Sequence, residues 1–209
     1  WKGTLVTNCN CTATGVTVSL APLLKDFGLK KVFLTSMQAL SGAGYPGISS
    51  MDLIDNIVPF IDGEEEKMES EPLKMLGNYD GKGSVRNADF QISAQCNRVS
   101  VIDGHVVSVK LELKQSVGID IIQESFSSYV PDSDVCRLPS APEKFIKIMS
   151  DIDRPQPRLD RNCGNGMSTV VGRIMKDSIL DLRYIVLSHN TVKGAAGGSL
   201  LNAELLVQK

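Results

Sequence analysis

Histidine, tryptophan and aromatic residues in general are scarce in this sequence of 209 residues. It contains two histidines, one tryptophan and 5% aromatic residues, so aliphatic side chains must supply most of the core packing. Its five cysteines include no Cys-x-x-Cys pair, and with two histidines this argues against a zinc site. We therefore predict no metal ligands, and reduced thiols that are typical of the cytoplasm.

Long apolar runs and an excess of basic residues are also missing. No run approaches the length of a membrane span, nothing at the start resembles a signal peptide, and the formal net charge is −2. These absences argue against nucleic acid and membranes as partners. The sequence begins at Trp1 without an initiator methionine and runs directly into a strand-like stretch, residues 3–7, so we predict a fragment of a longer protein.

Hydrophobic periodicity predicts one domain over residues 1–209 with a substantial core, since 42% of the residues are hydrophobic. Strand patterns occupy residues 30–40, 90–102, 106–113, 145–149, 167–174 and 180–187, and helical patterns occupy residues 12–27, 52–58, 64–76 and 117–126. Residues 78–87 are predicted to form a polar loop, and residues 190–206 a small-residue turn at 194–198 that leads into a last helix. Strands outnumber helices and often follow one another directly. This order predicts the α+β class, with a mixed or antiparallel sheet and helices on one face.

Cys11 has the clearest chemical signal in the sequence. It stands at the start of the first predicted helix, where unpaired backbone N–H groups and the helix dipole favour the thiolate, the nucleophilic form of cysteine. Most lone cysteines are small buried hydrophobic residues, but the amides of Asn8 and Asn10 flank this one. We interpret Cys11 as a nucleophile for covalent catalysis.

His105 and Arg98 form a second group of candidate residues. His105 follows Gly104 at a tight connection between two strands, where a histidine is more often a solvated turn residue than a base. Arg98 lies in an otherwise apolar strand and needs an anionic partner, for which a substrate carboxylate would serve with bidentate geometry. This neighbour favours His105 as the base that accompanies Cys11.

Two further segments have simpler explanations on composition alone. Residues 64–67 (EEEK) have the composition of a solvated helix start, with acids that complement the helix dipole. Residues 194–199 lack the Gly-x-Gly-x-x-Gly spacing of a dinucleotide loop. We interpret these small residues as a place where the backbone approaches a neighbouring group closely.

A series of motifs in a fixed order identifies a family resemblance. The motifs are residues 7–11 (TNCNC), 37–47 (MQALSGAGYPG), 63–67 (GEEEK), 97–99 (NRV), 103–105 (DGH), 153–158 (DRPQPR), 164–167 (GNGM) and 189–197 (HNTVKGAAG). With them, the chain resembles, almost end to end, the C-terminal catalytic and dimerisation half of the aspartate β-semialdehyde dehydrogenases, in the branch typical of archaea and fungi. The resemblance implies a fold like the C-terminal catalytic domain of the glyceraldehyde-3-phosphate dehydrogenase-like group.

The resemblance also implies roles for individual residues. Cys11 is expected to be the nucleophile and His105 the acid/base. Arg98 is expected to hold the α-carboxylate of the substrate and Glu64 its amino group. Lys67 is expected to bind the phosphate group.

The resemblance also implies three residues at the cofactor, and a second Glu-x-x-Lys pair gives the acid and lysine roles an alternative. Asn190 is expected to lie against the nicotinamide end of the cofactor, together with Ser41 and Gly42. Glu71 and Lys74 repeat the Glu-x-x-Lys spacing, so the sequence leaves open which pair contacts the substrate.

The implied reaction is the NADP-dependent reductive dephosphorylation of aspartyl-β-phosphate to aspartate β-semialdehyde and phosphate, through a cysteine thioester. It belongs to the biosynthesis of lysine, threonine and methionine. The family's N-terminal dinucleotide-binding domain has no counterpart here, so we expect most of the NADP site to lie outside this chain and the chain alone to be inactive. Residues 190–209 are expected to include a helix that packs back toward that domain. The family pairs through the sheet face, which implies a homodimer or tetramer.

Two other functional classes fit the same residues. A cysteine-dependent acyl hydrolase or transferase would use the Cys11 and His105 pair without a hydride step. A non-catalytic oligomerisation module would use neither residue. Dependence on a nicotinamide cofactor distinguishes the first of these classes from a dehydrogenase.

Overall fold

A computed structural model describes residue 3 and residues 5–208 of the chain. The strands are β1 (Leu29–Gln38), β2 (Asn78–Tyr79), β3 (Val85–Arg86), β4 (Gln91–Arg98), β5 (His105–Leu113), β6 (Ile146–Met149), β7 (Thr169–Lys176) and β8 (Leu182–Ser188). The helices are α1 (Cys11–Phe27), α2 (Ser50–Leu53), α3 (Glu64–Met75), α4 (Ile119–Ser127), α5 (Ser133–Cys136), α6 (Pro157–Asp160) and α7 (Gly197–Val207). Short 3-10 or π segments are η1 (Leu40–Ala43), η2 (Cys163–Gly166) and η3 (Val192–Ala196).

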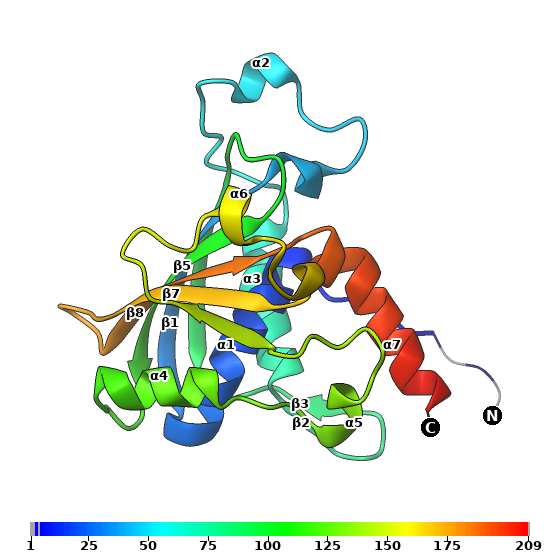
Figure 1. Cartoon of the computed structure of the whole chain (residues 1–209), viewed down its shortest axis with the longest axis vertical. Coiled ribbons are helices and arrows are strands. Elements are labelled where there is room, and N and C mark those ends of the chain that lie inside the picture. Colours follow the sequence, from blue (N-terminus) through cyan, green and yellow to red (C-terminus); the bar gives the residue numbers. More distant parts are fainter. Residues whose placement is uncertain (1–2, 4, 209) are drawn as a thin grey trace.

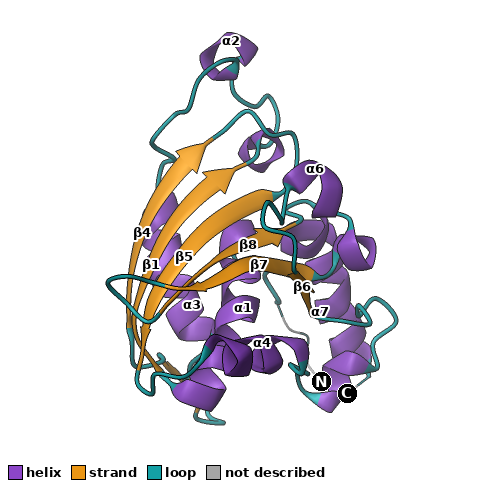
Figure 2. Cartoon of the chain, turned by 60° about the vertical axis from the view of Figure 1, so that its left-hand side comes forward, coloured by secondary structure: helices purple, strands orange, loops and turns teal. Residues whose placement is uncertain are grey.

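Six strands form one mixed sheet in the order β4-β1-β5-β8-β7-β6, and β2 and β3 form a separate two-stranded sheet. Helices α1, α3 and α4 lie on one face of the large sheet (Figures 1 and 2). The predicted α+β class, with a mixed sheet and helices on one face, is confirmed.

Strand directions bring distant segments to one end of this sheet. β1 runs parallel to β4, whereas β5 runs antiparallel to β1 and β8. Gln38 therefore pairs with Arg98 where β1 and β4 end, and His105 pairs with Ser188 where β5 begins and β8 ends. Arg98 and His105, which lie on successive strands in the sequence, are therefore found at the same end of the sheet.

Helix α1 crosses the sheet and forms the centre of the core. Val16, Leu20 and Leu23 are fully buried, which is the face that the helical periodicity predicts. On the sheet side, alternate residues of β5 from Val107 to Leu113 are at most 3% exposed. Burial of these aliphatic side chains provides most of the apolar packing, as the low aromatic content requires.

Some predicted elements differ from the structure. Residues 3 and 5–7 form no strand, and residue 4 lies outside the described residues. The predicted loop at 78–87 contains the β2–β3 hairpin, and the predicted helix at 52–58 is shortened to α2. The predicted turn at 194–198 is helical, because η3 continues directly into α7. Small residues there permit tight packing, which local propensity does not report.

Residues 150–166, called the strap below, cover part of the sheet face that carries no helix. Val171 and Val186 face the core, so the neighbouring Gly172 and Leu187 point to the opposite side. Gly172 lies directly against the backbone oxygen of Arg154, and Leu187 is fully buried. The strap therefore shields the β7 and β8 edge of this face from solvent.

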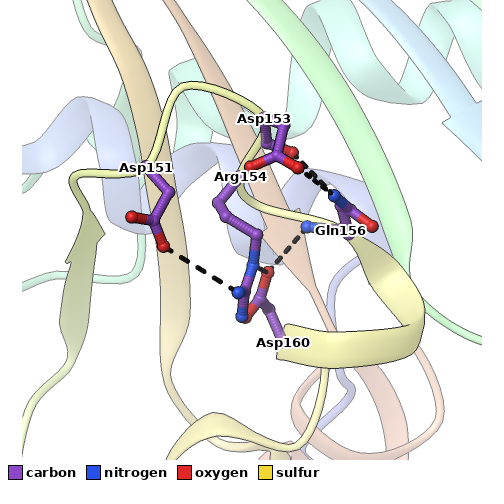
Figure 3. Close-up of polar contacts among 5 residues, drawn as sticks. All are labelled: Asp151, Asp153, Arg154, Gln156 and Asp160. Atoms are coloured by element: carbon purple, nitrogen blue, oxygen red, sulfur yellow. Dashed lines mark hydrogen bonds and ion pairs between the residues drawn. The ribbon is translucent and has the colours of Figure 1, made fainter.

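A buried ion pair holds the strap in shape (Figure 3). Asp160 is 1% exposed and accepts hydrogen bonds from the Arg154 guanidinium, one of them from Nε at 2.7 Å. The backbone N–H of Gln156 donates to the same carboxylate at 2.7 Å. These bonds to Arg154 and Gln156 hold the pKa of Asp160 below its ordinary value.

We expect Asp160→Asn to lower the free energy of unfolding by about 2 kcal/mol at neutral pH, because the amide leaves charged donors unpaired. Since the folded-state pKa of Asp160 is lowered, its contribution is present above the unfolded-state pKa and is lost as the pH falls through the folded-state value. Urea unfolding at neutral and acidic pH measures both effects. Asp151→Asn is the control, because Asp151 is 69% exposed and 4.0 Å from Arg154. Equal losses for the two variants would contradict the assignment.

Candidate active site

The candidate active site lies where α1 begins and β5 starts. Cys11 is the first residue of α1, and the side-chain oxygen of Asn10 accepts hydrogen bonds from the N–H groups of Thr12 and Ala13 at 2.9 and 3.0 Å. This cap fixes the first turn of the helix over the sheet end. There, Sγ of Cys11 lies 3.2 Å from Nε2 of His105. The structure thus brings the two predicted catalytic residues into direct contact.

His105 is buried, with 1% exposure, and is therefore no solvated turn residue. The backbone N–H of Ala39 donates to its Nδ1 at 3.0 Å. Because Nδ1 accepts, we infer that the neutral ring carries its hydrogen on Nε2 and donates toward Sγ of Cys11. Burial, with a contribution from the charge of Arg98, lowers the pKa of His105 to about 3. The ring is neutral at physiological pH.

Burial and a neighbouring charge both act on the pKa of the Cys11 thiol. Burial raises its pKa, and the negative charge of Glu64 raises it further. Hydrogen bonds at the helix start, from Thr12, act in the opposite direction but are smaller. The helix start therefore does favour the thiolate, as expected, but burial and Glu64 outweigh this effect, and the pKa of Cys11 is raised.

Arg98 is a buried guanidinium with unused capacity to bind an anion. It is 4% exposed and donates from Nη1 to the backbone oxygen of Ala39 at 2.6 Å. Its Nε is buried and has no hydrogen-bond partner among the described residues. Burial lowers the pKa of Arg98, while the nearby Glu64 opposes this shift. An additional anion would satisfy the free N–H.

Glu64 belongs to the site, although its composition suggested a solvated helix start. It is 7% exposed, and its Oε1 accepts hydrogen bonds from Asn10 Nδ2 at 2.9 Å and Gln38 Nε2 at 2.8 Å. Glu71, two turns further along α3, accepts from the backbone N–H of Asn10 at 2.6 Å. Both acids bond Asn10, but Glu64 also bonds Gln38, and its charge acts on the pKa values of Cys11 and Arg98.

Unlike Glu64, the two candidate lysines are not held at the site by contacts with other residues. Lys67 and Lys74 are both exposed. Neither side-chain ammonium group has a hydrogen-bond or ion-pair partner among the described residues, although the backbone oxygen of Lys74 accepts from Gly77. The structure thus leaves Lys67 as a solvated side chain on the helix whose first residue, Glu64, faces the site.

The three predicted cofactor residues brace the site from the other side. The buried Asn190 accepts from the backbone N–H of Gly104 and donates to Oγ of Ser41, both at 2.8 Å. Gly42 is packed so closely that a Cβ there would lie 2.7 Å from Cε1 of His105 and 2.8 Å from Nη1 of Arg98. Any side chain at position 42 would displace both groups.

Sequence reasoning did not identify two positions that organise the site. Ala39 orients the imidazole through its N–H and the guanidinium through its oxygen, and backbone contacts of this kind have no residue-type signal. Gly194 packs against Cys11, since a Cβ there would lie 2.6 Å from Cβ of Cys11. The run of small residues predicts such a close approach but not its target.

We expect Glu64→Gln to shift the pH profile of Cys11 alkylation to lower pH, because removing the negative charge lowers the pKa of the thiol. Iodoacetamide labelling across a pH series, followed by peptide mapping, measures the shift. Glu66→Gln is the matched control, because this side chain is exposed on the same helix. A profile that is the same in both variants would contradict the electrostatic coupling.

The described residues lack the features of a metal site and of a membrane span. They contain no group of three or more histidine, cysteine, aspartate or glutamate side chains placed to hold a metal ion. They also contain no helix with the length and apolar character that crossing a bilayer requires.

Comparisons with known proteins agree with this geometry. A family model described as semialdehyde dehydrogenase, dimerisation domain, matches residues 20–193. Curated relatives named aspartate-semialdehyde dehydrogenase include those of Archaeoglobus fulgidus, 52% identical over 100% of this chain and 59% of their own length, and Schizosaccharomyces pombe, 48% identical over 100% and 60%.

Solved structures give the same result. A crystal structure of aspartate semialdehyde dehydrogenase with NADP from Candida albicans is 40% identical, has a TM-score of 0.85, and aligns over 95% of this chain and 56% of that chain. The chain thus spans about three fifths of the length of such relatives. With its sheet, its helices and its family match in agreement, the chain belongs to the semialdehyde dehydrogenase dimerisation-domain family.

Proposed function

We propose that this chain is the catalytic and dimerisation part of an NADP-dependent aspartate-semialdehyde dehydrogenase. The complete protein would convert aspartyl-β-phosphate to aspartate β-semialdehyde and phosphate, a step toward lysine, threonine and methionine. The observation that carries the proposal is the 3.2 Å contact between Cys11 Sγ and His105 Nε2, beside a buried Arg98 with a free Nε–H. The relatives' names support the same activity.

The proposed chemistry begins with the sulfur of Cys11. Sγ, deprotonated as it attacks, bonds to the β-carbonyl carbon, and the bond from that carbon to the phosphate oxygen breaks. The thiol proton leaves on the departing phosphate, and a thioester remains. A guanidinium that binds the α-carboxylate would place the carbonyl at Sγ, and Arg98 has the free donor to do so. Glu64 would bind the amino group, and Lys67, which is free in solvent, would reach the phosphate.

The residues of the chain fit one end of a nicotinamide dinucleotide. Gly42 is exposed and lies against the imidazole, and the Ser41 hydroxyl and Asn190 amide adjoin it. NADPH, when bound, supplies the hydride that reduces the thioester. The Nε2–H of His105 would donate a hydrogen bond to the oxygen that becomes negative when the hydride is added. When the carbon–sulfur bond breaks, the aldehyde forms, and a proton from solvent, passed on by His105, would restore the Cys11 thiol. A thioester suits this step because thiolate is a good leaving group.

The test uses the full-length protein of which this chain is part. Aspartate semialdehyde should reduce NADP only when phosphate is present, as measured by the absorbance of NADPH. Hydrolysis of an acyl thioester without a nicotinamide cofactor would instead support the cysteine hydrolase class. The 209-residue chain alone should be inactive and should show no measurable NADPH binding, and micromolar affinity in a titration would contradict the placement of most of the cofactor site outside it.

We further propose that two copies pair through the helix-free sheet face in an isologous dimer. The family description, a dimerisation domain, supports pairing of two copies. Phe33 stands on this face and is 45% exposed, between the buried Val32 and Leu34.

Helix α7 has no fully buried residue, which suits a helix that packs against a further domain.

We expect the chain to sediment as a dimer or larger at micromolar concentration, and Phe33→Glu to shift it toward monomer, because a charge would be buried at the interface. Ile121→Glu is the control, since Ile121 is 50% exposed on α4, on the opposite face. A wild-type chain that sediments as a monomer would refute this interface.

A further inference from the structure

A cavity of about 260 Å³ lies between α1, the end of η3 and α7. Its walls are mainly aliphatic and aromatic and come from α1, α7 and the segment between α4 and β6, including Val18, Leu138, Phe145, Leu201 and Leu205. The exposed Asn8 stands at its edge. None of Cys11, His105, Arg98 or Glu64 lines it. We call this space the α7 cavity.

Lys193 is the one basic residue among the described residues that line the α7 cavity. It is 6% exposed, and its Nζ donates to the backbone oxygen of Met167 at 2.7 Å. No aspartate or glutamate belongs to the described lining, and the remaining ionisable groups there are the thiol of Cys9 and the phenol of Tyr129. A buried ammonium with one carbonyl partner keeps two N–H donors for another acceptor.

Burial makes the positive charge of Lys193 energetically unfavourable when the cavity holds no anion. Burial lowers the pKa of Lys193 to about 8, and Cys9 opposes the shift only in part. An anion that entered the cavity would offset this desolvation, whereas a neutral ligand would not. The walls are too apolar to favour a phosphate or another ligand that is polar on all sides.

We propose that the α7 cavity binds a small aliphatic carboxylate, with the carboxylate on Lys193 Nζ and the aliphatic part among Val18, Phe145 and Leu201. Gly194, the next residue of the π-helix η3, packs against Cys11. The ligand would therefore bind next to Gly194, the residue that packs against Cys11. This site is separate from the proposed substrate site.

The test uses the 209-residue chain and hexanoate as the probe at pH 7, with 1-hexanol as its neutral counterpart. Methyl resonances of valine and leucine, followed by NMR, should show saturable shifts in Val18, Leu138, Leu201 and Leu205 at millimolar hexanoate. Hexanol should bind at least about tenfold more weakly, because it cannot form the charge-assisted bond. Lys193→Met should cause a similar loss, while the exposed Lys147→Met should bind as wild type.

Arg98 offers a second buried cation, so Arg98→Met separates the two sites. Binding that survives Arg98→Met and is lost in Lys193→Met supports the α7 cavity. Binding that depends on Arg98 would overturn it while leaving the proposed substrate site intact. Equal binding of hexanol and hexanoate, or no saturable shifts, would also overturn it. If Lys193→Met fails to fold by circular dichroism, the shift map and the hexanol comparison on the unaltered chain decide.

Discussion

Replacing His105 with asparagine in the complete enzyme should lower kcat by roughly 10²–10⁴-fold, the usual effect of losing a positioned acid/base. The asparagine oxygen can still accept the Ala39 N–H that now binds Nδ1, so the fold around position 105 should persist. The shorter side chain has no group at the Nε2 position, 3.2 Å from Cys11 Sγ. Steady-state kinetics measure the effect, and KM should change much less than kcat.

His105→Gln separates hydrogen bonding from proton transfer at this position. The glutamine amide can reach the position of Nε2 and donate a hydrogen bond, but it cannot exchange a proton at working pH. We expect it to bind substrate as the wild type does and to remain strongly impaired in kcat. A large change in KM with kcat intact would instead make His105 a substrate ligand. Wild-type kcat in either variant would exclude the acid/base role.

Arg98→Lys should reduce kcat/KM almost as much as Arg98→Ala, with a loss on the order of 2–4 kcal/mol. A lysine can replace the bond to the Ala39 oxygen, but it has no second donor at the position of the unpartnered Nε. Neither variant can therefore bind a carboxylate through two parallel hydrogen bonds. Initial rates at subsaturating aspartate semialdehyde measure the loss directly.

A substrate analogue without the α-carboxylate provides the sharper test of Arg98. The wild type should discriminate strongly against it, whereas Arg98→Lys should discriminate little, because the group that reads the carboxylate is missing. Arg183→Lys is the matched control, since Arg183 is exposed at the other end of the sheet. An Arg98→Lys enzyme that performs like wild type would show that the carboxylate is bound elsewhere.

The sequence by itself determined the class of the fold and singled out Cys11 as the proposed nucleophile. Apolar periodicity predicted α1 and β1 within one or two residues, because both elements bury one continuous face. The helix start at Cys11 and the lone arginine in an apolar strand are local features, visible without any long-range contact. The wrong strand at residues 3–7 shows the limit, since β-branched residues form a strand only where a neighbouring strand can pair with them.

Only the tertiary structure decided how these residues act. The pKa of Cys11 depends on burial and on Glu64, which is 53 residues away in sequence and arrives through the packing of α3 beside α1. The tautomer of His105 depends on the Ala39 N–H, a backbone group that every residue type except proline offers. Which of Glu64 and Glu71 stands beside the catalytic pair also depends on where α3 meets Asn10. Local sequence determines which groups are available, whereas desolvation and hydrogen-bond partners come from segments that meet only in the folded chain.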